Sequence, residues 1–486
     1  MAYTPLLSVV LGLFIVCCRL SLTDGTNPGF QGRVTQSGLD YLRDVSVRIF
    51  EIGATQMIIP DFNWNAGSLI GTIDYRLSNL DITEFTVPSS SLTTRDGVGL
   101  VLHGSSMRLR LTGNWRYSNR GFIRIRDSGS FTGTFSGASL GLTMRIGIDT
   151  DGRLTVSSGS SDCSFDAGNV NVRLNGGASW LYNLFSDFIN QQVKSVLGSK
   201  TCTLITDVVN NDLQHRLDLL KTMAPIDDKA TIDYSFLESP SFSGYVDTFH
   251  KGEVFASTGP RVEAPNTIPV IPEDPDTSRH VFLWLTDYLF QTAGYVYYQA
   301  GVMAVDITKD MFPPGQTCTL DTSSWCIEGP LPQLSQMYPE MPLEAHVRAT
   351  APPVVDISST HLYISINLDI DFLGILPDNS KVNFFTLNAT VHGSTLLSIS
   401  DNKLKWTVSL VETDLQLEMS SIGNFDVTPL TQGIDIACTI LLLPWLNDEG
   451  EKGLPLPTSD YLKLERPVID QGQGFIKLGA DIRFIS

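Results

Sequence analysis

The chain has 486 residues, and its 33 Lys and Arg against 52 Asp and Glu give a formal net charge of −19. This charge excludes a generally basic nucleic-acid coat and a uniformly cationic antimicrobial protein. Hydrophobic residues make up 42% of the chain and charged residues 17%, while 40 Gly and 25 Pro are too few for a low-complexity or collagen-like protein. The length therefore predicts a globular protein of about two to four domains, with two large ones as the working expectation.

An unbroken apolar run from Leu6 to Cys18 opens the chain. The run has the length of a signal-peptide core and is too short to span a bilayer, although no Lys or Arg precedes it. The alternative is a buried N-terminal strand, which is disfavoured because no polar residue alternates through the run. A later apolar stretch, Ile436 to Leu446, contains Pro444 and is also too short to span. We therefore expect a signal peptide at residues 1–22 and a secreted, soluble mature protein.

The first half combines alternating strands with amphipathic helices. Apolar residues at helical spacing predict a helix from about Thr35 to Phe50 and a longer one from about Ala178 to Leu197. The segment Met107 to Thr112 alternates apolar and polar residues with period two, which is typical of a half-buried strand. An apolar helical stripe is core packing more often than a lipid site, so these helices do not by themselves predict a pocket.

Five prolines between Pro260 and Pro275 predict an extended connector between two halves of similar length. Beyond it we expect a helix near Asp287 to Gly301 and a long alternating strand from Leu362 to Phe372. Residues 26–250 have a net charge of −3, whereas residues 251–486 have a net charge of −16. Mostly antiparallel strands with helices on one face predict an α+β architecture built twice.

Six arginines lie between Gly97 and Arg126, a span with no acidic residue. If Met107 to Thr112 and Phe122 to Arg126 form a hairpin, two of the arginines fall in or near its turn with Trp115. Arginine suits phosphate binding because its planar fork donates two hydrogen bonds, and a neighbouring aromatic ring can enter a lipid headgroup boundary. The alternative is a solvated hairpin whose arginine stems cover apolar surface. The candidate anion-binding residues are Arg108, Arg110, Trp115, Arg116, Arg120, Arg124 and Arg126.

Catalytic and metal signatures are weak. Gly137 to Gly141 matches the Gly-x-Ser-x-Gly elbow of lipases, but an alternating strand rather than a helix follows it, so we expect no catalytic residue. No Cys-x-x-Cys or His-Glu-x-x-His motif occurs and the seven His are scattered, so we expect no metal site.

Five segments, in order, resemble the family of bactericidal/permeability-increasing protein, lipopolysaccharide-binding protein and the plasma lipid-transfer proteins. The segments are Asn27-Pro28-Gly29 with Arg33 to Tyr41, Gly113 to Arg120, the pair Cys163 and Cys202, Thr286 to Gly294, and Gly453 to Pro457. The resemblance implies an elongated, boomerang-like molecule of two barrels, each a twisted antiparallel sheet with packed helices, joined by a central sheet. The expected domains are an N-terminal barrel at 23–250, the linker and central sheet at 251–279, and a C-terminal barrel at 280–486.

The resemblance also implies a function at lipid aggregates. We expect a non-enzymatic, innate-immune protein that binds lipopolysaccharide and phospholipid at Gram-negative bacterial surfaces, with bound phospholipid in the barrel pockets and no nucleic-acid partner. Antibacterial action would be a further property, and the acidic second half would face solvent or a partner protein. The alternatives are an extracellular carrier of phospholipid or sterol ester and a structural or storage protein.

Cysteines and a sequon complete the expected sites. A Cys163–Cys202 disulfide would attach the long helix to the sheet, and Cys318 and Cys326 would form a second bond that the family pattern lacks. Cys438 is then odd, and its apolar surroundings favour a buried thiol. Asn388 begins an Asn-x-Thr sequon, which predicts a glycoprotein.

Overall fold

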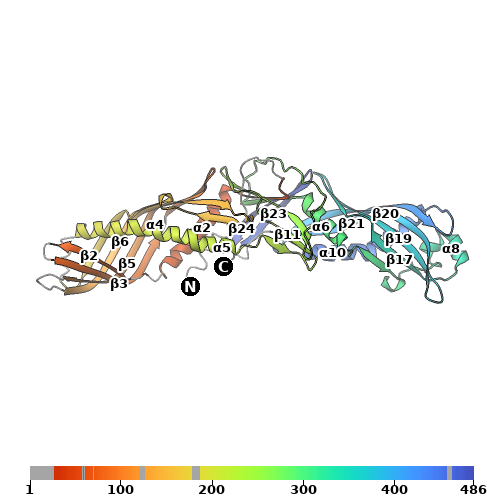
Figure 1. Cartoon of the computed structure of the whole chain (residues 1–486), viewed down its shortest axis with the longest axis horizontal. Coiled ribbons are helices and arrows are strands. Elements are labelled where there is room, and N and C mark those ends of the chain that lie inside the picture. Colours follow the sequence, from red (N-terminus) through yellow and green to blue (C-terminus); the bar gives the residue numbers. More distant parts are fainter. Residues whose placement is uncertain are drawn as a thin grey trace.

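The structure is a computed structural model that describes residues 27–56, 59, 61–68, 71–119, 126–177, 186–456 and 462–485. The molecule is elongated, with one sheet-and-helix unit at each end and a sheet between them (Figure 1). The expected α+β, two-barrel architecture is confirmed. The expected signal peptide lies outside the described residues.

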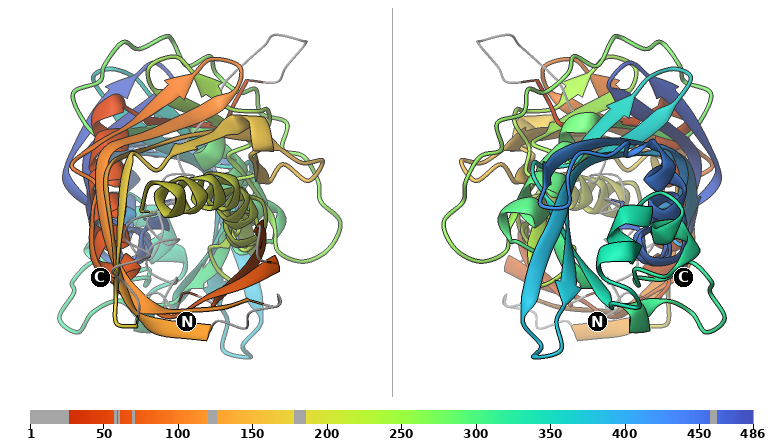
Figure 2. Two further views of the ribbon diagram at one scale, coloured as in Figure 1. Left: turned by 90° about the vertical axis from the view of Figure 1, so that its left-hand side faces the viewer. Right: turned by 90° about the vertical axis from the view of Figure 1, so that its right-hand side faces the viewer.

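The N-terminal unit is an eight-stranded antiparallel sheet that curls around a long helix, α4 (Figure 2). Its strands are β2 (Phe62–Ser68), β3 (Gly71–Thr86), β4 (Ser89–Arg95), β5 (Gly99–Asn119), β6 (Arg126–Ile148), β7 (Leu154–Ser157), β8 (Cys163–Asp166) and β9 (Asn169–Asn175). Its helices are α2 (Gln36–Ala54), α4 (Ser186–Asp207) and α5 (Gln214–Asp218).

Local sequence explains why α2 begins where it does. The hydroxyl of Thr35 accepts a hydrogen bond from the backbone N–H of Gly38 at 3.3 Å, which satisfies one of the free donors at the helix start. Leu39 and Leu42, which the periodicity placed on the apolar face, are fully buried. Helix α4 continues ten residues beyond the expected end at Leu197, and residues 178–185 lie outside the described part.

The C-terminal unit repeats this plan with a seven-stranded sheet. Its strands are β16 (Ala304–Ile307), β17 (Leu343–Ala349), β18 (Val354–Ile357), β19 (Leu362–Ile375), β20 (Lys381–Ser400), β21 (Lys403–Ser420) and β22 (Leu454–Pro455). Its helices are α6 (Asp287–Gln299), α7 (Trp325–Glu328), α8 (Pro332–Met337), α9 (Thr431–Ala437) and α10 (Leu443–Lys452). The expected helix and long strand therefore appear as α6 and β19.

A six-stranded central sheet joins the two units and contains strands from both ends of the described chain. In spatial order it contains β12 (Ser241–Phe242), β13 (Val246–His250), β1 (Phe30–Val34), β15 (Val281–Thr286), β24 (Phe475–Phe484) and β23 (Leu462–Gly472). Every residue of β1, β13 and β15 is buried, so the middle of the sheet is covered on both faces. A smaller sheet of β10 (Met223–Pro225), β11 (Ala230–Asp233) and β14 (Glu253–Ala256) lies beside it.

The strands of the central sheet lie outside 251–279, the range where the sequence placed it together with the linker. From residue 257 to 280 the chain contains no strand or helix. Polar groups attach this segment to the central sheet: Lys477 contacts the carboxylates of Asp274 and Asp276 at 2.7 Å, and the Asn27 amide donates to the Ile268 carbonyl at 3.1 Å.

Residues Thr428–Lys452 form one continuous helix of 25 residues that includes α9 and α10. An 18-residue window of this helix has a mean hydropathy of 1.3, so by length and composition it could cross a membrane. The apolar stretch from Ile436 to Leu446 is therefore part of a longer helix than the sequence indicated, because the helix continues through Pro444. A π-helical turn at Cys438–Leu442 ends two residues before Pro444 and accommodates a residue that lacks a backbone donor.

Candidate functional site

Four of the arginines that the sequence singled out share one exposed face of the β5–β6 hairpin. In the strand register, Arg108 pairs with Ser136, Arg110 with Thr134, Arg116 with Ser128, and Arg126 with Ser118. Paired residues point to the same side of a sheet, and alternate residues along a strand point to opposite sides. The four arginine side chains are exposed, and in the described part of the chain none of them forms an ion pair.

The expected positions within the hairpin need correction. Strand β5 is longer than predicted and extends to Asn119, so Arg116 lies within it, and the described part of β6 begins at Arg126. Arg120 and Arg124 lie outside the described residues. Period-two alternation indicated the strand correctly, but it could not show where the strand ends.

Trp115 lies within β5 rather than in or near the turn where the sequence placed it. Only 5% of it is exposed, and it packs in a core cluster with Leu80, Phe131 and Val172 on the inner side of the sheet. Its indole N–H donates to the carbonyl of Asn175 at 3.2 Å. Trp115 lies one residue from Arg116 and therefore on the opposite face of the strand, so it stabilises the sheet that carries the arginines.

Neighbouring strands add charges that the local sequence could not reveal. Arg76 in β3 pairs with Arg116, and Arg173 in β9 pairs with Thr132 on the same face. Glu84 in β3 lies directly opposite Arg110, so the arginines are not without a nearby carboxylate as the chain order suggested. We define the arginine face as the exposed side of these strands, with the basic residues Arg76, Arg108, Arg110, Arg116, Arg126 and Arg173 and the acidic residues Asp74, Asp81 and Glu84.

The inner side of the same sheet is apolar and aromatic. Tyr75 and Tyr117 pair across β3 and β5, and the ring of Tyr117 stacks on Trp115 with centroids 6.2 Å apart. Burial raises the pKa of Tyr75, and the neighbouring phenol of Tyr117 adds to the shift. The phenol of Tyr75 is thus neutral at physiological pH. Cationic outer residues and neutral inner residues give the sheet two chemically different faces.

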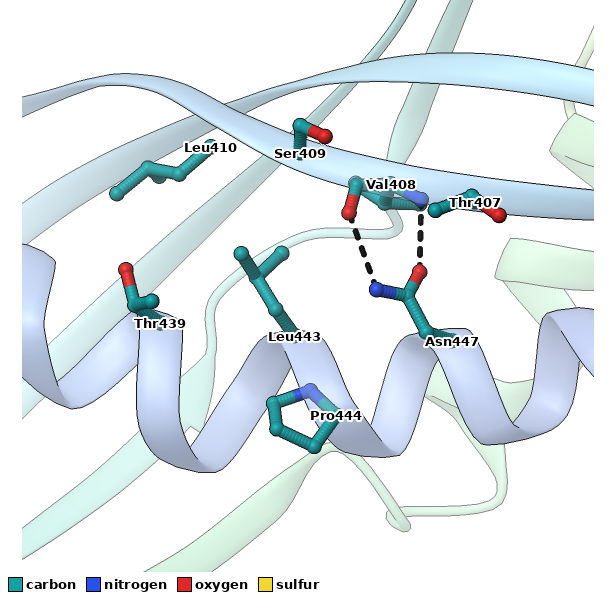
Figure 3. Close-up of a pocket in the computed structure, with 8 residues that line it drawn as sticks. All are labelled: Thr407, Val408, Ser409, Leu410, Thr439, Leu443, Pro444 and Asn447. Atoms are coloured by element: carbon teal, nitrogen blue, oxygen red, sulfur yellow. Dashed lines mark hydrogen bonds between the residues drawn. The ribbon is translucent and has the colours of Figure 1, made fainter.

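The C-terminal unit has a pocket of about 480 Å³ between β21 and the helix that contains α10 (Figure 3). Asn447 bridges the two elements, because its side-chain carbonyl accepts from the Val408 N–H at 2.7 Å and its amide donates to the Val408 carbonyl at 3.2 Å. The pocket is lined by Thr407, Val408, Ser409, Leu410, Thr439, Leu443, Pro444 and Asn447. Most residues of the Thr428–Lys452 helix are half-buried, and Trp445 is its one large hydrophobic side chain that is clearly exposed.

Comparison with known proteins identifies the family. Residues 38–213 match the model of the LBP / BPI / CETP family, N-terminal domain, and residues 224–484 match that of its C-terminal domain. The chain belongs to the LBP/BPI/CETP family. It is 29% identical to a bactericidal permeability-increasing protein of Sebastes schlegelii (97% of this chain, 99% of the relative) and 29% identical to a lipopolysaccharide-binding protein of Homo sapiens (98% of each).

A solved structure supports the same assignment over the whole molecule. The crystal structure of lipopolysaccharide binding protein superposes with a TM-score of 0.62 at 26% identity, and the match covers 95% of this chain and 100% of that one. By their names, these relatives bind lipopolysaccharide or increase the permeability of bacteria.

Both expected disulfides are present in this family member. Cys163 in β8 bonds to Cys202 in α4, which links the helix to the curled sheet, and Cys318 bonds to Cys326. Cys438 is a buried free thiol, and burial, together with the nearby Asp435 carboxylate, raises its pKa to about 11. A thiol with so high a pKa is protonated and unreactive at neutral pH.

Two other sequence features lie within strands. The Gly137 to Gly141 segment is part of β6, and Ser139 pairs with Asp166 of β8. Ser139 therefore lacks the strand-to-helix turn that exposes a lipase nucleophile. Asn388 lies in the middle of β20, is half-buried, and donates from its amide to Asp369 at 3.3 Å. Its glycosylation stays a prediction.

Proposed function

We propose that this chain is a secreted innate-immune protein that binds lipopolysaccharide and anionic phospholipid through the arginine face. The observation that carries the proposal is the set of four exposed arginines, Arg108, Arg110, Arg116 and Arg126, that share one face and have no ion pair in the described structure. A guanidinium without a carboxylate partner keeps its fork of donors available for a phosphate.

Acyl chains would occupy apolar space between each sheet and its helix. Support comes from the C-terminal unit, where a pocket of about 480 Å³ lies between β21 and the helix that contains α10 and is lined in part by Val408, Leu410 and Leu443. Each CH₂ group removed from water contributes about 0.8 kcal/mol, so even a short acyl segment would add substantially to phosphate binding. The acidic C-terminal half would face solvent or a partner protein, because its charge of −16 opposes contact with an anionic surface.

The test compares two variants with the same loss of charge. One variant replaces Arg108, Arg110 and Arg116 with Ser. The control replaces Arg48, Arg95 and Arg153 with Ser, because these exposed arginines lie elsewhere on the N-terminal half. Binding to lipopolysaccharide micelles, phosphatidylglycerol vesicles and phosphatidylcholine vesicles is measured over a salt series.

Each basic side chain near an anionic surface contributes about 1 kcal/mol, so we expect the first variant to bind lipopolysaccharide on the order of 100-fold more weakly at low salt. The control should retain most of its affinity. Equal binding by both variants would refute the arginine face as the anion site.

The second candidate function is a neutral-lipid carrier, which the pocket between β21 and the helix that contains α10 favours. A carrier would take up phosphatidylcholine with little dependence on salt, and both triple variants would behave as the wild type does. Salt-sensitive binding selective for lipopolysaccharide would instead support the first function.

A further inference from the structure

Three neighbouring strands of the C-terminal sheet bring a histidine and two carboxylates together. In the register of β19, β20 and β21, Ser365 pairs with His392, and His392 pairs with Glu412. Asp414 lies two residues beyond Glu412 on β21 and pairs with Thr390, so it points to the same side. These side chains lie on the face opposite the buried Val391 and Thr413. The cluster is far from the arginine face, which belongs to the other end of the molecule (Figure 1).

The geometry of the cluster suits a metal ion. One ligand atom from each of His392, Glu412 and Asp414 lies within 4.8 Å of the other two. The distance from His392 Nε2 to Asp414 Oδ2 is 3.6 Å. A cation placed between these atoms could reach all three with only small side-chain movements, because zinc–nitrogen and zinc–oxygen bonds are about 2.0 to 2.2 Å long.

A fourth residue orients the imidazole. Ser365 Oγ lies 2.8 Å from His392 Nδ1, on the side of the ring away from the carboxylates. Metal-binding histidines in proteins commonly use one ring nitrogen for the metal and the other for such a hydrogen bond, which fixes the tautomer and the ring orientation. Ser365 therefore holds the imidazole with Nε2 turned toward Asp414.

Among the described residues, no Lys or Arg neutralises the two carboxylates. In the described part of the chain, neither Glu412 nor Asp414 forms an ion pair with Lys or Arg, and the imidazole of His392 is the partner of Asp414. Arg348, on the same sheet, is already bound to Asp369 and Asp371. A β-bulge at Val411 adds an extra residue to β21 next to His392 and alters the direction of the following side chains.

We propose that His392, Glu412 and Asp414 form a surface site for a divalent transition-metal ion, with Zn²⁺ as the best match. One imidazole nitrogen and two carboxylate oxygens are ligands that zinc accepts, and three protein ligands leave a fourth position for water. Calcium and magnesium prefer ligand sets made of oxygen alone, so the imidazole selects against them. A bound ion would connect β20 to β21 beside the bulge and stabilise this part of the sheet.

This site was not expected from the sequence. Glu412 and Asp414 lie 20 and 22 residues after His392 in the sequence, and no short motif contains all three. Only the pairing of β20 with β21 brings His392 beside Glu412.

The experiment measures Zn²⁺ binding to the full chain by competition with a chromophoric chelator. The variants are His392→Gln and Asp414→Asn, and the matched control is His361→Gln. His361 is another half-exposed histidine beside one carboxylate, with its Nε2 3.2 Å from Asp356, but it belongs to no three-residue cluster in the described structure. Circular dichroism confirms that each variant is folded.

We expect the wild type and the His361→Gln control to bind one equivalent of Zn²⁺. His392→Gln should lose this binding, and Asp414→Asn should bind the ion at least 10-fold more weakly. Ser365→Ala should weaken binding by about 10- to 100-fold as a positioning residue. Cobalt substitution should give visible absorption bands that His392→Gln lacks. The proposal is overturned if the wild type binds no Zn²⁺, if His392→Gln keeps wild-type affinity, or if an equal concentration of Ca²⁺ displaces the ion.

Discussion

A buried ion pair in the central sheet gives a sharp test of what holds the two units together. Arg33 in β1 donates from Nε and Nη2 to the two carboxylate oxygens of Asp247 in β13, at 2.6 and 2.8 Å. The side chains are only 4% and 7% exposed. The guanidinium also donates to the backbone carbonyl of Asp274 in the linker and lies 3.8 Å from the ring centroid of Tyr245. One side chain therefore connects two strands and the linker.

The proposed perturbation is Arg33→Gln. Removing one partner of a buried pair costs about 3 to 5 kcal/mol, because the remaining charge stays in a region without water. The stacking on Tyr245 is part of this cost rather than an addition to it. The matched control is Arg483→Gln in the same sheet, where Arg483 and its partner Glu465 are 51% and 41% exposed. Exposed pairs contribute about 0 to 1 kcal/mol.

Hydrogen exchange of the β1 and β15 amides is the suitable assay, because a molecule of several units need not unfold in one step. A loss of 3 kcal/mol corresponds to exchange more than about 100-fold faster when exchange follows the opening equilibrium. The linker at 257–280 should also become more sensitive to proteases. Adding Asp247→Asn to Arg33→Gln should recover part of the loss, since it removes the buried charge. Unchanged exchange in Arg33→Gln, or an equal effect of the control, would refute the reasoning.

Three further predictions concern other parts of the molecule. Replacing Cys163 and Cys202 with Ala should lower unfolding stability by about 4 kcal/mol, since the bond closes a separation of 39 residues, as thermal denaturation will show. Burial lowers the pKa of His250 from 6.5 to about 4. As the pH falls, His250 is therefore protonated in the unfolded chain before it is protonated in the folded one. About 3 kcal/mol of folding stability that is present above pH 6.5 should be lost as the pH falls towards 4. His250→Gln should flatten that part of a pH series of melting temperatures. Trp115→Ala should cost about 3 to 5 kcal/mol, but below its melting temperature it should leave the salt dependence of vesicle binding unchanged.

Local periodicity predicted those elements whose pattern is set by one buried face. Leu39 and Leu42 on α2, and Ile370 and Phe372 on β19, are buried as the helical and alternating spacings indicated. The order of elements along the chain, together with the family resemblance, was enough for the architecture. The central sheet gave no comparable signal, because β1 pairs with β13 and β15 from more than 200 residues away. Such pairings depend on the packing of the whole molecule.

In the candidate sites, the difference between what local sequence could predict and what it could not is even clearer. The run of arginines was visible in the sequence, but their neighbours were not. Whether Glu84 opposes Arg110, or Arg173 joins the same face, depends on strand register across separate hairpins. The misplacement of Trp115 has a similar cause, since a strand a few residues longer than expected moves the residue from a turn into a buried position.

The net charge of −19 does not oppose binding to an anionic surface once the charges are placed in space. At physiological salt an exposed charge is screened beyond about 8 Å, so a surface interacts with the groups that face it rather than with the total charge. The arginine face belongs to one end of an elongated molecule, and the half with a charge of −16 extends to the other end (Figure 1). Attraction at one end and repulsion at the other would favour contact through the N-terminal unit. The acidic half then affects orientation more than affinity, and removing acidic residues there should change vesicle binding less than removing arginines from the arginine face.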